Sequence, residues 1–90
     1  MKYFDWDVDK NKKLIQERDI SFEEIIVAIE EGRLIDVVQH KNKSKYPQQK
    51  IFIVNVAEYA YLVPFVEDEH KIFLKTIIPS RKATKKYIIQ

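Results

Sequence analysis

The sequence predicts a single α+β domain over residues 1–90, in which an antiparallel sheet of about four to five strands packs on two helices and a short C-terminal helix follows. Helix-start signals occur in the first third of the chain and again after residue 79. Runs rich in β-branched and aromatic residues fill the stretch between them. Short turns separate most of these runs, which is typical of antiparallel pairing. With 90 residues and 46% hydrophobic content, the chain can build one small core.

The N-terminal segment predicts a short strand followed by an amphipathic helix. Residues 2–6 form the strand, with Tyr3, Phe4 and Trp6 as core candidates. Asp7 can cap a helix over about residues 8–18, because its carboxylate can accept hydrogen bonds from the free N–H groups of the first turn.

A second helix begins at a capping box. Ser21 and Glu24 have the required spacing, with Ser21 at the cap and Glu24 reaching back to its N–H. Four apolar residues then follow a helical period and define a core face: Phe22, Ile25, Ile26 and Ile29. Gly32, the only glycine in the chain, suits a left-handed residue after the helix.

Four strand-like runs and a last helix complete the predicted order β-α-α-β-β-β-β-α. The runs are Leu34–Gln39, Lys50–Val56, Tyr59–Val66 and Lys71–Ile78. Pro64 lies inside the third run, so we expect an edge strand or a bulge there. Pro79 cannot continue a ladder, and Ser80 can cap a helix over about Arg81–Tyr87.

Composition excludes several functional classes. The chain has no cysteine and two histidines, His40 and His70, so we expect neither thiol chemistry nor a metal or other cofactor. No apolar run approaches the roughly 18–20 residues that span a bilayer, so no membrane partner is expected. The N-terminus lacks the apolar region of a signal peptide, which predicts a cytoplasmic protein.

Charge alternates strongly along the chain although the net charge is only +2. Residues 1–40 carry six basic and ten acidic groups, residues 41–56 four basic groups and no acid, residues 57–70 four acids and no base, and residues 71–90 six basic groups and no acid. Two interpretations stay open. The charges are either ordinary solvated faces, or the loop before Lys50 and the C-terminal segment converge into one basic patch.

Three segments together resemble one known family. The residues from Phe4 to Asp7 followed by Lys10 resemble the opening of the BrnT family of type II toxin–antitoxin toxins. The residues from Ser21 to Glu24 resemble its second-helix start, and Ile77 to Thr84 (Ile-Ile-Pro-Ser-Arg-Lys-Ala-Thr) resembles its closing signature. The resemblance implies a RelE-like ribonuclease fold, metal-independent cleavage of RNA that inhibits translation, neutralisation by a cognate antitoxin, and possible homodimers.

The sequence departs from that family at four places. Glu17-Arg18-Asp19 replaces a Lys-His-Gly run, Leu14 replaces an Asn, Lys50 replaces an Arg, and Thr76 stands in place of a basic residue. The missing histidine removes the obvious proton-transfer group. The alternative to a ribonuclease is therefore a catalytically weak relative that binds antitoxin or RNA without cleaving it. A third alternative is a protein-binding module whose basic C-terminal element docks an acidic helix.

Candidate site residues follow from what metal-independent cleavage of RNA needs, namely positive charge near the phosphate and a group that transfers a proton. Arg81 is the first candidate for the phosphate, because a guanidinium can bind two phosphate oxygens at once. Lys50 is a further candidate for stabilising charge in catalysis, and His40 for general acid or base. Lys10, Lys75 and Lys82 are candidates for RNA binding. Each can instead be an ordinary surface residue.

Five other side chains have a similar choice of roles. Phe52, Tyr61 and Phe73 could stack on bases or belong to the core. The carboxylates of Glu23 and Glu24 are expected to serve the helix start rather than catalysis.

Overall fold

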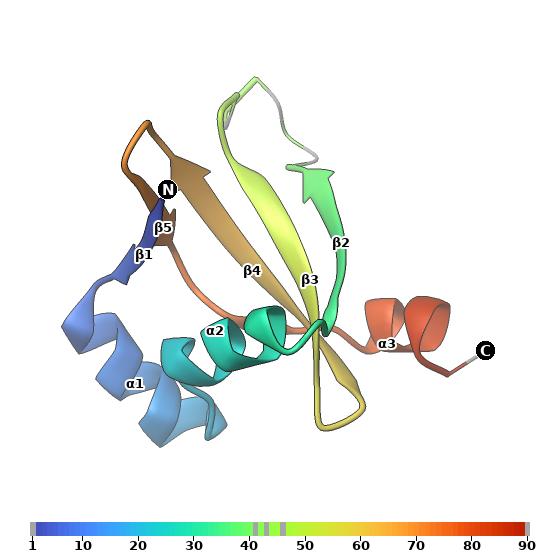
Figure 1. Ribbon diagram of the computed structural model, residues 1–90. Coiled ribbons are helices and arrows are strands. Elements are labelled where there is room, and N and C mark those ends of the chain that lie inside the picture. Colours follow the sequence, from blue (N-terminus) through green and yellow to red (C-terminus); the bar gives the residue numbers. More distant parts are fainter. Residues whose placement is uncertain (1, 41, 43, 46, 90) are drawn as a thin grey trace.

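The computed structural model describes residues 2–40, 42, 44–45 and 47–89 of the chain. It is an α+β domain with three helices and a mixed sheet (Figure 1). The elements, in order, are β1 (Tyr3–Trp6), α1 (Val8–Arg18), α2 (Phe22–Glu30), β2 (Leu34–Gln39), β3 (Lys50–Val56), β4 (Tyr59–Glu67), β5 (Lys71–Leu74), β6 (Ile78–Pro79) and α3 (Arg81–Tyr87). No helix formed by the described residues has the length and apolar character that a bilayer crossing requires.

All three helices begin where the sequence predicts, each at a capping side chain. Asp7 accepts a hydrogen bond from the Asp9 N–H at 3.0 Å. The hydroxyl oxygens of Ser21 and Ser80 accept hydrogen bonds from the N–H three residues on, at 3.2 Å and 3.1 Å. Gly32 adopts φ +83°, a conformation that costs glycine little. These predictions are confirmed.

The sheet is mixed, so the prediction of a purely antiparallel sheet is wrong. Its strand order is β1-β5-β4-β3-β2, with β6 also paired to β4. The β1–β5 pair is parallel, and the other pairs are antiparallel. After β1 the chain leaves the sheet through α1 and α2 and re-enters at the opposite edge in β2 (Figure 1). No short turn joins β1 to β5, so nothing local requires them to run in opposite directions.

Pro64 divides the predicted strand Lys71–Ile78 in two. Leu74 of β5 pairs with Phe65, whereas Ile78 of β6 pairs with Leu62, so the three residues 75–77 stand opposite the two residues 63–64. Pro64 has no N–H to donate, and its carbonyl accepts from the Lys75 N–H at 2.8 Å. The irregularity therefore lies in the neighbouring strands, and β4 is internal rather than an edge.

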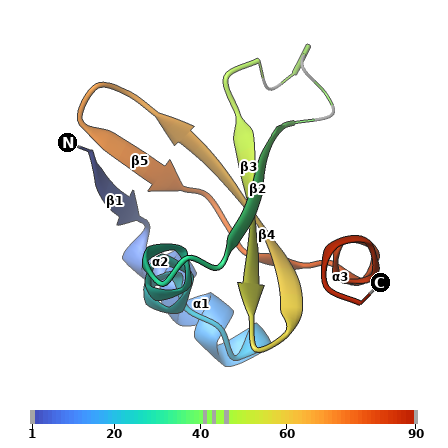
Figure 2. The same cartoon turned by 45° about the vertical axis from the view of Figure 1, so that its right-hand side comes forward.

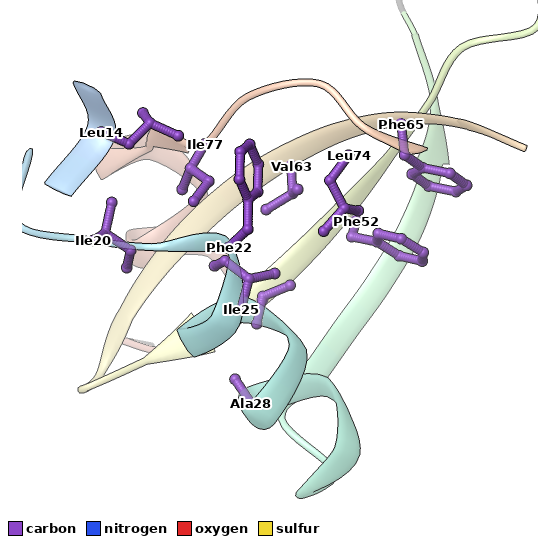
Figure 3. Packing of buried hydrophobic residues seen from close by; sticks show 11 residues of the cluster. Leu14, Ile20, Phe22, Ile25, Ala28, Phe52, Val63, Phe65, Leu74 and Ile77 are labelled. Atoms are coloured by element: carbon purple, nitrogen blue, oxygen red, sulfur yellow. The ribbon is translucent and has the colours of Figure 1, made fainter. Parts of the chain in front are cut away.

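The helices lie on opposite faces of the sheet. Figure 2 shows α1 and α2 on one side and α3 on the other. We call these the two-helix face and the α3 face. The two-helix face carries the main core, in which Phe22 and Ile25 of α2 are fully buried against side chains of β3, β4 and β5 (Figure 3). A smaller cluster, built around Ile53, Ala60 and Ala83, joins α3 to the other face.

A buried asparagine, Asn11, connects the two N-terminal helices. It is 7% exposed; its Oδ1 accepts from the Phe22 N–H at 2.8 Å, and its Nδ2 donates to Glu23 Oε1 at 2.7 Å. The Phe22 N–H is one of the donors that a helix start leaves without an intrahelical partner. Asn11 therefore satisfies a buried donor of α2 from within α1 and fixes the angle between the two helices.

Replacing Asn11 with alanine leaves the Phe22 N–H buried without a partner, so Asn11→Ala is expected to lower the free energy of unfolding by about 1–3 kcal/mol. Thermal unfolding followed by circular dichroism measures the loss, at roughly 4–8 °C per kcal/mol for a domain of this size. The exposed neighbour Lys12 provides the control, because Lys12→Ala removes a side chain from the same helix without removing a buried contact. Equal melting temperatures for the two variants would contradict this role.

Candidate functional site

The closing segment anchors α3 to the sheet through its buried residues. Ile77 is fully buried in the main core, and Ala83 and Thr84 are buried where α3 meets β4. The Ser80 N–H donates to the Ala60 carbonyl at 2.9 Å. The Thr84 hydroxyl donates to the Ser80 carbonyl at 2.7 Å and accepts from the Ala60 N–H at 2.9 Å. Half of the Ile-Ile-Pro-Ser-Arg-Lys-Ala-Thr segment is thus explained by packing and hydrogen bonds.

The basic residues of α3 differ in their effect on the fold. Lys85 and Lys86 lie in the last turn, where the macrodipole favours positive charge, whereas Arg81 and Lys82 have no such role. Arg81, Lys82, Lys85 and Lys86 are exposed, and within the described part of the chain none of them forms an ion pair with a carboxylate. Arg81 and Lys82 occupy the first turn of the helix, where the macrodipole disfavours positive charge. Their position therefore costs helix stability rather than adding to it. The helix presents positive charge that an external anion can neutralise.

A groove of about 320 Å³ runs between α3 and the sheet. Its floor consists of apolar side chains from β2, β3 and β4: Val38, Ile51, Ile53 and Leu62. The wall from α3 contributes Lys82, Lys86 and Tyr87, and the Lys86 ammonium lies 5.1 Å from the centroid of the Tyr87 ring. No acidic side chain lines this groove, so it suits a negatively charged ligand.

A second group of cations lies further along the α3 face. Residues of β5 alternate, with Ile72 and Leu74 in the core and Phe73 on the opposite side. The ammonium groups of Lys71 and Lys75 lie 5.9 Å and 5.7 Å from the centroid of the Phe73 ring. The structure therefore places Lys75 on the same face of the sheet as Arg81 and Lys82.

Lys50 lies on the other face. It pairs directly with Phe65 of the main core, and its ammonium lies 3.7 Å from Glu67 Oε1. Glu67 also accepts from the Lys2 ammonium at 2.9 Å, and this hydrogen bond is the main reason that the pKa of Glu67 is lowered. The positive charge of Lys50 is therefore partly neutralised by Glu67, and the structure does not bring Lys50 together with Arg81.

The structure gives His40 a hydrogen-bond partner in a local turn and places Lys10 on α1. His40 follows β2, and its Nδ1 accepts a hydrogen bond from the Asn42 N–H at 3.1 Å, so this nitrogen is used in the local turn. Lys10 is half-buried on α1, on the two-helix face. The predicted convergence of the loop before Lys50 with the C-terminal segment depends in part on Lys41 and Lys43, which lie outside the described residues.

The three aromatic candidates divide between the two faces. Phe52 stacks on Phe65 in the core, with ring centroids 3.9 Å apart. Tyr61 packs against the same core, and burial is the main cause that raises its pKa, followed by the nearby Tyr59. Phe73, half-buried between two lysines, is left as the candidate for contact with a ligand.

The two glutamates at the start of α2 serve the helix, as predicted. The Glu23 carboxylate accepts from Asn11, and Glu24 Oε1 accepts from the Ser21 hydroxyl at 3.4 Å, in place of the Ser21 N–H that the capping box predicts. Within the described residues, no group of three or more His, Cys, Asp or Glu side chains is arranged to hold a metal ion.

The anchoring role of Thr84 can be separated from any role in binding. Thr84→Val keeps the shape of the side chain but leaves the buried Ala60 N–H without an acceptor, so we expect a loss of about 1–3 kcal/mol in the free energy of unfolding. Chemical denaturation measures this loss. Arg81→Ala serves as the comparison, since it removes a larger and exposed side chain of the same helix and is expected to leave stability nearly unchanged. The reverse order of stabilities would show that α3 is held in another way.

We compared the chain with protein-family models, with curated proteins and with solved structures, and none of the three comparisons gave a match. The family resemblance of the three sequence segments therefore stays a prediction.

Proposed function

We propose that this domain is a toxin-like RNA-binding protein whose α3 contacts the phosphate backbone, and that a cognate antitoxin neutralises it by covering the same helix. The observation that carries this proposal is the set of four exposed cations on a seven-residue helix, none of which is paired with a carboxylate of the described residues. The resemblance of the closing segment to the BrnT family also supports RNA as the ligand of α3.

The electrostatics of α3 favour a polyanion as ligand. Fold stability does not require Arg81 and Lys82 at the N-terminal end of the helix, as the macrodipole shows. A guanidinium next to ammonium groups is the usual means by which proteins hold phosphate. The adjoining groove contains Lys82 and Lys86 and no acidic side chain, so nothing along it repels a phosphate chain.

Binding of RNA requires only the exposed cations of α3, whereas cleavage of RNA requires further groups. Metal-independent cleavage needs a group that transfers a proton beside the scissile phosphate. His40 uses its Nδ1 in a turn, and Lys50 lies on the opposite face from Arg81. These placements support binding without cleavage as the first function.

Cleavage is the second candidate, because the groove offers one residue that could replace the missing histidine. Tyr87 lines the groove together with Lys82 and Lys86 and carries a phenolic proton. In this version, the 2′-hydroxyl oxygen attacks the phosphorus and loses its proton to water while the bond from phosphorus to the 5′-oxygen breaks, which leaves a 2′,3′-cyclic phosphate. Arg81 and Lys82 stabilise the charge on the phosphate, and Tyr87 donates its proton to the leaving 5′-oxygen and recovers one from water.

The binding proposal predicts that Arg81→Ala/Lys82→Ala weakens binding of a fluorescent single-stranded RNA of unrelated sequence. Because each phosphate contact on a single strand contributes about 0.7 to the slope of log K against log salt, losing two contacts reduces the slope by about 1.4. Fluorescence anisotropy at several salt concentrations measures both quantities. The matched control is Lys12→Ala/Lys13→Ala, which removes the same charge from exposed positions on α1. Equal losses for the two double variants would show that only net charge matters.

The cleavage candidate predicts growth arrest when the wild-type protein is expressed without an antitoxin. Arg81→Ala and Tyr87→Phe should each relieve the arrest, and purified wild-type protein should shorten RNA in the presence of a metal chelator. Gel electrophoresis of the incubated RNA gives the direct measurement. RNA that is bound yet stays at full length would exclude cleavage and leave the binding function in place.

A further inference from the structure

The part of the α3 face that α3 does not cover carries two aromatic side chains. In β1, Phe4 and Trp6 pack into the main core, so the alternating residues Tyr3 and Asp5 lie on the other face. Tyr3 is 58% exposed, so its prediction as a core residue is wrong, because it lies on the opposite face from Phe4 and Trp6. In the parallel β1–β5 pair, Tyr3 is in register with Lys71, and Asp5 is in register with Phe73. The rings of Tyr3 and Phe73 therefore lie diagonally on neighbouring strands of one surface.

Two lysines lie close to Phe73, and one of them, Lys71, is in register with Tyr3. Lys71 and Lys75 both contact Phe73, at 5.9 Å and 5.7 Å from the ring centroid. The Lys71 ammonium lies 3.5 Å from Asp5 Oδ2, so one carboxylate of the surface is already paired. Lys75 forms no ion pair with a carboxylate of the described residues. The surface thus has an excess of positive charge and a cation whose main contact is an aromatic ring.

We propose that Tyr3 and Phe73 form a base-stacking platform for single-stranded RNA, with Lys75 contacting the phosphate beside the base that stacks on Phe73. This inference rests on the proposed RNA-binding function and names the form of RNA that the site takes. Single strands expose the faces of their bases, and aromatic side chains on an open sheet stack on them regardless of sequence. Duplex RNA buries those faces and offers only its backbone.

The platform and α3 can be reached by one strand of RNA. Along β4, Ala60 packs in the α3 cluster and Leu62 lines the groove, whereas Val66 is in register with Phe73. Four residues of strand separate Leu62 from Val66, which corresponds to about 13 Å. Lys75 also lies five residues before Ser80, the cap of α3. A strand that stacks on Phe73 can therefore continue along the sheet to Arg81 and Lys82.

Charge and shape favour RNA over a protein as the occupant. Lysine is depleted at the cores of protein–protein interfaces, whereas here two lysines lie beside Phe73. A ring next to a cation suits a base next to a phosphate.

The test uses a 12-nucleotide single-stranded oligouridylate and a 12-base-pair RNA duplex as probes, with binding measured by fluorescence anisotropy at low salt. Tyr3→Ser and Phe73→Leu should each weaken binding of the single strand by roughly 5- to 100-fold. Binding of the duplex should change less than about twofold, because stacking does not contribute to it. Phe73→Tyr keeps the ring and should bind as the wild type does.

Two controls keep folding and stacking apart. Tyr3 is largely exposed, so Tyr3→Ser is expected to preserve the melting temperature even if Phe73→Leu lowers it. Val37→Ser removes another exposed apolar side chain, 44% exposed on β2, from the two-helix face, and should not affect either probe.

The outcomes separate this inference from the function on which it rests. If Arg81→Ala/Lys82→Ala weakens binding but Tyr3→Ser and Phe73→Leu bind the single strand as tightly as the wild type, the platform is wrong and the proposed function stands. Equal loss of single-strand and duplex binding in Tyr3→Ser would also overturn the platform. If the wild type binds neither probe, both proposals fail.

Discussion

The position of α3, which carries the candidate site residues Arg81 and Lys82, depends on the backbone of Ala60. Its carbonyl accepts from the Ser80 N–H, and its N–H donates to the Thr84 hydroxyl. Both polar groups of a fully buried strand residue are thus satisfied by the two ends of the first turn of α3. This pairing holds a short helix against the sheet that would not be stable on its own, since isolated helices of this length do not form in water. It also directs Arg81 and Lys82, which lie between Ser80 and Thr84, toward solvent.

Pro64 determines how the chain reaches that helix. Because proline lacks the N–H that a continuous ladder would need, β5 stops pairing at Leu74, and pairing resumes in β6 at Ile78. The extra residue in this interval lets Ile77 turn fully into the main core. Arg18 donates to the Ile77 carbonyl from α1, so the two-helix face also holds the interrupted segment. The missing N–H of Pro64 thus divides the neighbouring segment into the short strands β5 and β6, and β6 leads into α3.

Local signals made the elements predictable, but not the pairing of the strands. Helix starts could be located because Asp7, Ser21 and Ser80 act within three residues of themselves. The parallel pairing of β1 with β5 depends on contacts between residues about 70 positions apart, for which the sequence contains no local rule. Alternation in β5 predicts that Phe73 and Leu74 point in opposite directions, but only the packing of the helices shows which face is buried.

The dependence of strand pairing on contacts between distant residues also explains which candidate site residues share a face of the sheet. Arg81, Lys82 and Lys75 share a face because α3 packs on the side of the sheet that carries Phe73, whereas Lys50 belongs to the other face because it pairs with Phe65. Asn11 was missed because a polar residue in a helix carries no sign that it reaches a neighbouring helix start.

The concentration of positive charge on one short helix has a consequence for regulation. Four cations within seven residues can be neutralised by one RNA backbone or by one acidic protein surface, but not by both at once. Under the proposed function, an antitoxin that covers α3 would therefore block RNA by occupying the same charges, without a conformational change in this domain. The Tyr3 and Phe73 surface lies further along the sheet, so an occupant of α3 alone would leave it open. Under the proposed functions, complete exclusion of a single strand thus requires a partner that extends from α3 across β4 to β5.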